Sequence, residues 1–161
     1  MTATTMVPTF AATQATPVTY DNRNVTPGDD TGVWGVIVPT AITFTDDSRT
    51  GDAAVELTGL KGYSLEDFGE DFSVAVTVKS ANGYQLTKGD KTADYSLTYG
   101  DKVYTKTDDV EADKTDKEVA ALTKVAAKQE GTATLTTPAT EKGTYKDTLT
   151  YTFTGTGTVL K

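Results

Sequence analysis

Apolar and polar residues alternate along much of this chain. In residues 72–78, 95–99 and 149–153, every second side chain is apolar, and the side chains between them are polar or small. This period of two is typical of strands that turn one face to a core and the other face to water. Residues 42–44 and 55–57 repeat the pattern more briefly and predict two further strands.

A continuous apolar run covers residues 33–38 and ends at Pro39, which predicts a strand buried on both faces. Turn-forming pairs separate the predicted strands. Asn82-Gly83 predicts a hairpin between a strand that ends near Ser80 and residues 84–86, because this pair accepts positive φ at both turn positions. The other predicted turns are Gly51-Asp52, Gly89-Asp90, Gly100-Asp101 and Lys142-Gly143.

Residues 116–130 allow two interpretations. They contain good helix formers with apolar residues three and four positions apart, and Asp116 and Gly131 stand where a cap and a stop belong. One short helix is the favoured prediction, and a pair of short strands is the alternative. The spacing of Ser64 and Asp67 matches a capping box and predicts one more helical turn.

About eight short strands with at most one or two short helices predict an all-β fold, a β-sandwich of Ig-like or jelly-roll type. The sandwich is expected to occupy residues 33–161, after a flexible N-terminal arm of residues 1–32. The inward-facing residues give the expected core: Trp34, Val36, Val38, Ile42, Phe44, Leu57, Phe72, Val74, Val76, Leu97, Leu149, Tyr151 and Phe153.

The start of the chain has the composition of an export-signal end. Residues 1–15 carry no charge and are rich in small side chains, and the pairs Thr9/Ala11 and Thr13/Ala15 have the spacing found before a signal cleavage site. Two interpretations stay open, the end of an export signal whose upstream part lies outside this chain and a flexible tail.

Composition excludes several classes of chemistry. The chain has no Cys and no His, which excludes disulfide scaffolds, thiol catalysis, Ser-His-Asp triads and almost every zinc site. Its formal charge of -8 disfavours nucleic acid and anionic membrane surfaces as partners. No stretch approaches the length of apolar residues that a membrane span needs, and we expect no membrane insertion and no cofactor.

Acidic clusters are the only candidates for a chemical site. Asp109, Glu111 and Asp113 alternate like the first ligands of a calcium loop. However, Lys114 stands where such a loop needs Gly, and no Glu follows at the twelfth place. The favoured interpretation is a solvated loop without a metal, and we expect no catalytic residues and no enzymatic activity.

Two strands carry a family resemblance. Residues 143–153 contain the pattern G-x-Y-x-D-x-L-T, and residues 36–44 begin with V-x-V-P. Both segments resemble strands of fimbrial and spore-coat-U type β-sandwich subunits and of exported Gram-positive surface proteins. The resemblance implies an exported structural or adhesive subunit. Within the motif, the Tyr145 hydroxyl is expected to find a backbone partner, and Asp147 is expected to cap the strand that follows.

These observations lead to two functional hypotheses, both at the bacterial cell surface or in secreted form. The first is a structural subunit of a fibre, pilus or extracellular matrix, assembling with itself or with other surface subunits. Val18 and Tyr20 alternate with polar neighbours, so the N-terminal arm is a candidate strand for an open edge of the next subunit. The alternative is a monomeric cell-surface module that binds a carbohydrate or a host protein through its loops.

Overall fold

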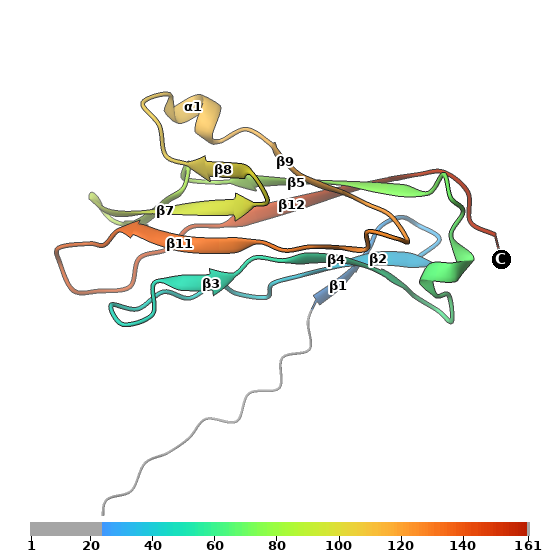
Figure 1. The fold of residues 1–161 in the computed structure, drawn as a ribbon. Helices are drawn as coiled ribbons and strands as arrows, with labels where there is room; N and C mark the ends of the chain where they lie inside the picture. Colours follow the sequence, from blue (N-terminus) through green and yellow to red (C-terminus); the bar gives the residue numbers. More distant parts are fainter. Residues whose placement is uncertain (1–23, 161) are drawn as a thin grey trace, which may run out of the picture.

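The computed structural model describes residues 24–160 and confirms the prediction of an all-β sandwich. The proposed assembly residues Val18 and Tyr20, and both candidate cleavage spacings, lie outside the described residues. Strands form two layers, with β5 (Ser73–Ser80) and β12 (Leu149–Thr156) above β2 (Trp34–Val38) and β4 (Val55–Gly59) (Figure 1).

Most of the strands belong to two antiparallel sheets. Their orders are β1-β2-β4-β10 and β3-β11-β7-β6, with β8 also paired to β7. These two sheets are joined at one place. β3 is followed directly by β4 in the chain, and β10 is followed directly by β11. Between these pairs of strands, the Ala53 N–H donates to the Gly131 carbonyl at 2.9 Å. The strands not yet bounded are β1 (Asn24–Pro27), β3 (Thr50–Asp52), β6 (Gln85–Lys88), β7 (Lys91–Tyr99), β8 (Lys102–Thr105), β10 (Lys128–Gln129) and β11 (Thr132–Thr137).

The third sheet has the order β12-β5-β9, with β9 at Lys117–Leu122. Every second residue of β5 is buried, as the period of two predicted. These residues meet the buried face of β2, where the Trp34 and Phe72 rings pack edge to face with centroids 5.9 Å apart. Seven predicted core residues are buried: Trp34, Val36, Leu57, Phe72, Val74, Val76 and Leu97.

The favoured helix at residues 116–130 was wrong, because the segment forms β9 and β10 with a turn between them. β9 pairs with β5 from Lys117 to Leu122 and buries Val119 and Leu122. The hydrogen bonds of this pairing and the burial of two apolar side chains outweigh the helix preference of the alanines, which amounts to less than about 1 kcal/mol per residue.

Two turn predictions were also wrong in detail. Asn82-Gly83 forms a turn, with φ +67° at Gly83, but β5 and β6 on either side belong to different sheets and do not form a hairpin. Gly51-Asp52 lies inside β3, opposite Thr132 and Ala133. By contrast, Gly89-Asp90 and Gly100-Asp101 form tight hairpins, since Lys88 pairs with Lys91 and Tyr99 with Lys102.

The predicted helical turn exists as a 3-10 turn at Leu65–Asp67, with the Ser64 N–H donating to the Asp67 carboxylate at 2.8 Å. One further short helix, α1 (Val110–Asp113), lies in the acidic segment. The sheet begins earlier than expected, because β1 falls within the residues assigned to the arm and pairs with β2.

The turn between β1 and β2 is held by one carboxylate. Asp29 accepts hydrogen bonds from the Trp34 Nε1–H at 2.9 Å, from the Thr31 hydroxyl at 2.5 Å and from the Gly32 N–H at 3.1 Å. β1 is therefore held beside the buried Trp34, and the described sheet begins at Asn24.

Candidate functional site: a groove along one side of the sandwich

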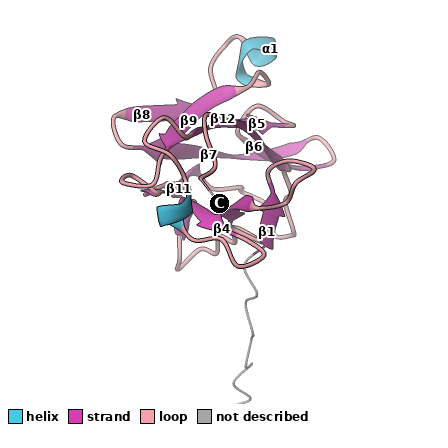
Figure 2. Cartoon of the chain, turned by 90° about the vertical axis from the view of Figure 1, so that its right-hand side faces the viewer, coloured by secondary structure: helices cyan, strands magenta, loops and turns pink. Residues whose placement is uncertain are grey.

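The two sides of the sandwich differ in how they are closed. On one side, β8 and β9 lie next to each other (Figure 2). The Tyr104 hydroxyl donates to the Glu118 carbonyl, and Lys102 Nζ lies 3.1 Å from the Glu118 carboxylate. On the other side, β12 pairs only with β5 among the described strands, so its outer edge faces the segment that follows β2.

That segment, residues 39–45, continues the direction of β2 but belongs to no ladder. Its burial still alternates, because Ile42 and Phe44 are half-buried whereas Thr43 is exposed. A Cβ placed on Gly51 would lie 2.8 Å from Cγ2 of Ile42, so the segment runs beside β3 on one flank. The segment predicted as a strand at residues 42–44 is thus extended, but it is not paired as a strand with any of residues 24–160.

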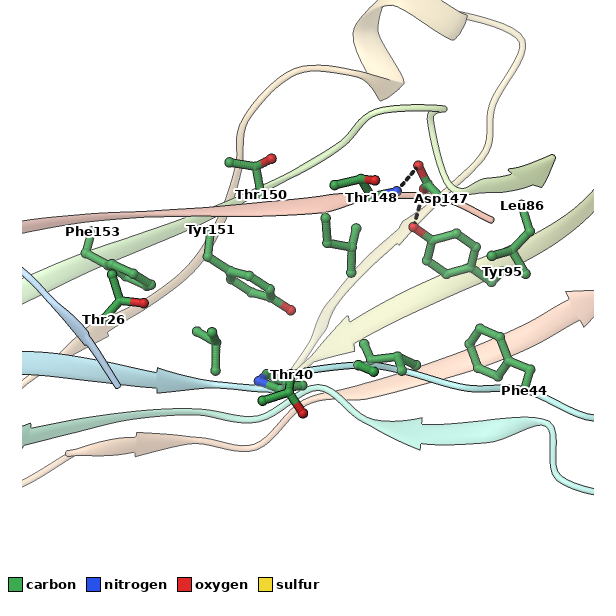
Figure 3. Close-up of a pocket in the computed structure, with 15 residues that line it drawn as sticks. Thr26, Thr40, Phe44, Leu86, Tyr95, Asp147, Thr148, Thr150, Tyr151 and Phe153 are labelled. Carbon is green, nitrogen blue, oxygen red and sulfur yellow. Dashed lines mark hydrogen bonds between the residues drawn. The ribbon is translucent and has the colours of Figure 1, made fainter. Parts of the chain in front are cut away.

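A groove of about 470 Å³ lies between residues 38–44 and β12, and we call it the seam groove. Tyr151 and Phe153 point into it from β12, with Thr26 beside Phe153 at one end and Phe44 near Tyr95 at the other (Figure 3). Its walls are largely apolar, and Asp147 is the one charged side chain among the residues that line it.

The seam groove collects the predicted core residues that the described structure leaves half-buried: Val38, Ile42, Phe44, Leu149, Tyr151 and Phe153. Their sequence pattern is that of core residues, yet water reaches one side of each. Leaving apolar surface in water costs about 25 cal/mol for each Å², and contiguous apolar surface of this kind marks a binding site. The groove is therefore the candidate functional site.

Both ends of the groove are closed by packing. At the end near Phe153, the Trp34 ring lies against β12 so closely that a Cβ on Gly155 would be 2.4 Å from its Cζ2 atom. At the other end, the Asp147 carboxylate accepts hydrogen bonds from the Ser80 hydroxyl at 2.6 Å and the Tyr95 hydroxyl at 2.5 Å. The opening is thus confined to the stretch of β12 between these contacts.

Asp147 also accepts the backbone N–H groups of Asn82 at 3.0 Å and Thr148 at 2.7 Å. One carboxylate thereby joins the end of β5, the turn after it, β7 and the start of β12. This matches the capping role expected from the motif. The Tyr145 hydroxyl likewise donates to the Glu141 carbonyl at 3.0 Å, as expected.

The tyrosines around the groove remain protonated. Burial is the main cause that raises the pKa of Tyr95, and the hydrogen bond to Asp147 raises it further. Burial also raises the pKa of Tyr99 and of Tyr151, whose hydroxyl oxygens lie 2.9 Å apart. These hydroxyl groups therefore act as neutral hydrogen-bonding partners beside the groove.

The three calcium candidates have other partners. Asp109 caps α1 by accepting the Ala112 N–H at 3.0 Å, and Glu111 lies 3.7 Å from Lys114 Nζ. Asp113 is buried and accepts two hydrogen bonds from Thr107. Within residues 24–160, no group of three or more acidic side chains is arranged to hold a metal ion.

The sequence did not predict the groove, although it predicted six of the fifteen residues that line it as core residues. One signal in the sequence was Pro39. Proline has no backbone N–H to donate, so β2 ends before it and the extended segment after it is not part of the sheet. Which strand lies across the gap depends on the packing of the two layers.

Compared with known proteins, the chain matches no family model, no curated protein and no solved structure. The resemblance to fimbrial subunits therefore stays a prediction. In the part of the chain that the structure describes, no helix has the length and apolarity needed to cross a membrane.

Proposed function

We propose that this chain is a structural subunit of a bacterial surface fibre, pilus or extracellular matrix, and that subunits join by placing an extended strand in the seam groove. The observation that carries the proposal is the set of half-buried core residues along the groove. A further strand would cover apolar surface that the described residues leave in contact with water, and it would thereby complete the sandwich.

An extended strand has the right shape for this groove. Both walls are extended, and both present inward side chains at every second residue, Ile42 and Phe44 on one wall and Leu149, Tyr151 and Phe153 on the other. An added strand offers side chains at the same period of two. Peptides recognised in this way gain affinity from main-chain hydrogen bonds and specificity from alternate side chains.

The N-terminal segment is the proposed donor. Residues 1–20 carry no charged side chain, which suits an apolar groove, and Val18 and Tyr20 supply two alternate apolar side chains. The surface location in this proposal comes from the closing-strand motif and the signal-like composition of residues 1–15.

The alternative of a carbohydrate-binding module has less support. Stacking on sugars needs exposed aromatic faces, and every tyrosine among residues 24–160 is buried or half-buried. The groove is lined by apolar side chains and threonines, with a single carboxylate that is already saturated by four donors.

The test removes residues 1–23 and compares the truncated and full chains by size exclusion with light scattering and by electron microscopy over a range of concentrations. We expect oligomers or fibres from the full chain, and a folded monomer, judged by its circular dichroism, from the truncated one. A full chain that stays monomeric at every concentration, or a truncated chain that polymerises undiminished, contradicts the proposal.

A further inference from the structure

The pairing of β1 with β2 specifies where the preceding residues would lie if the strand continued. Asn24 lies opposite Val38 and Thr26 opposite Val36, so each step back along β1 matches one step forward along β2. The same antiparallel register, carried past Asn24, places Tyr20 opposite Ile42 and then Val18 opposite Phe44.

This register also determines which side chains face the groove. Directly opposite residues in an antiparallel pair point to the same face of the sheet. Thr26 already lines the groove, so the even-numbered residues before it would face inward if the strand continued. Tyr20 and Val18 would therefore enter the groove.

The charges of the segment agree with this register. Asp21 and Arg23 are odd-numbered, so in this register they would face solvent. A slip of one residue would exchange the two faces. It would place both charges against apolar walls whose single carboxylate, Asp147, is already engaged by four donors. The positions of these two charges thus favour this register over one shifted by a single residue.

We propose that residues 17–23 of the same chain extend β1 along residues 39–45 and cover the seam groove of the isolated subunit with Val18 and Tyr20. The chain needs no linker to reach the site, because Asn24 is already paired with Val38 at the groove's edge. Covalent attachment gives the segment a high effective concentration there, which favours it over a segment from another molecule.

In one respect this inference rests on the proposed function. If subunits assemble through the groove, residues 17–23 leave their own groove and enter that of a neighbour in the same register, which is an exchange of identical elements between protomers. The isolated subunit is then closed by its own segment, and assembly replaces that segment with the neighbour's.

Engineered disulfides test the register and the occupant together, since the chain has no other Cys. The variants are Tyr20→Cys with Ile42→Cys, and Val18→Cys with Phe44→Cys. Opposite residues in antiparallel strands have Cα atoms roughly 4.5–5.5 Å apart, within the range of roughly 4.4–6.8 Å that a disulfide spans. The matched control is Thr19→Cys with Ile42→Cys, in which the two side chains point to opposite faces.

Each variant is oxidised at low protein concentration and examined by non-reducing electrophoresis and intact mass. We expect cross-linked monomer from both in-register pairs and little from the control. Cross-links found only between molecules overturn closure by the same chain. Absence of cross-links in both pairs, or equal cross-linking in the control, overturns the register as well.

Size exclusion of the cross-linked monomers before and after reduction separates this inference from the proposed function. We expect the oxidised form to stay monomeric and the reduced form to assemble. Intramolecular cross-links in a protein that fails to assemble even when reduced support closure by the same chain and refute the proposed function. Assembly of the oxidised form as readily as the reduced form refutes the exchange of segments.

Discussion

Among single residues, Asp147 joins the largest number of segments at one end of the groove. Its carboxylate accepts hydrogen bonds from the Ser80 and Tyr95 hydroxyls and from two backbone N–H groups. Ser80 is itself buried and accepts the Tyr84 N–H at 2.7 Å, so the network reaches into the core.

Asp147→Ala is expected to lower the free energy of unfolding by about 3 kcal/mol, because buried hydroxyls lose their acceptor and each unsatisfied group costs about 1–3 kcal/mol. Urea denaturation followed by Trp34 fluorescence measures the change. Asp47→Ala, at an exposed position, is the control and is expected to change stability by less than about 0.5 kcal/mol. Equal effects of the two variants would contradict the structural role of Asp147.

Asp29 gives stability a defined pH dependence. The hydrogen bond from Thr31, and also that from Trp34, lowers the pKa of Asp29 below its ordinary value of 3.8. A lowered folded-state pKa contributes stability that is present above the unfolded pKa and lost as the pH falls through the folded value. We therefore expect the wild type to lose stability more steeply than Asp29→Asn below about pH 4.

The measurement is urea unfolding at several pH values between about 5 and 3, followed by the emission of Trp34, the one tryptophan of the chain. Asp30→Asn, at the next position, is the matched control and is expected to keep the wild-type profile. Parallel profiles for the wild type and Asp29→Asn would show that the carboxylate does not stabilise the turn.

At the scale of elements, the important pair is β12 and the extended segment 39–45. Neighbouring residues of that segment face opposite ways, since Ile42 is half-buried in the groove and Thr43 is exposed. The segment therefore supplies its own matched variants for testing whether the groove is the assembly surface.

Ile42→Lys is expected to abolish or greatly weaken assembly, because it places a charge where an incoming strand needs apolar contact. Thr43→Lys, which adds the same charge on the outer face, is expected to assemble like the wild type. Circular dichroism checks that both variants keep their β structure, and light scattering measures assembly. Equal assembly by the two variants would place the interface elsewhere.

Strands with a strict period of two were the most predictable elements. β5, the second half of β7 and the first half of β12 follow the alternation of residues 72–78, 95–99 and 149–153. Residues 116–130 were not predictable, because their alanines favour a helix and only the pairing with β5, which is distant in sequence, makes part of the segment a strand. The groove could not be predicted from the sequence either, since no local pattern indicates which strands face each other across the sandwich.

For the whole molecule, the contrast between the two sides of the sandwich is the main result. On one side, Tyr104 of β8 donates a hydrogen bond to the Glu118 carbonyl of β9, and Lys102 forms an ion pair with the Glu118 carboxylate. The side between β12 and residues 38–44 holds apolar side chains that the described residues only half cover. Polar contacts thus close the gap between strands on one side, and on the other side an apolar gap remains, where we propose that a further strand binds.

The close contact of Trp34 with Gly155 and the cluster at Asp147 act as stops at the two ends of the seam groove. These two contacts would limit how far a strand in the groove could move along its own length. In a filament joined through such grooves, every junction would consequently have the same length, and the axial repeat would be constant from one subunit to the next.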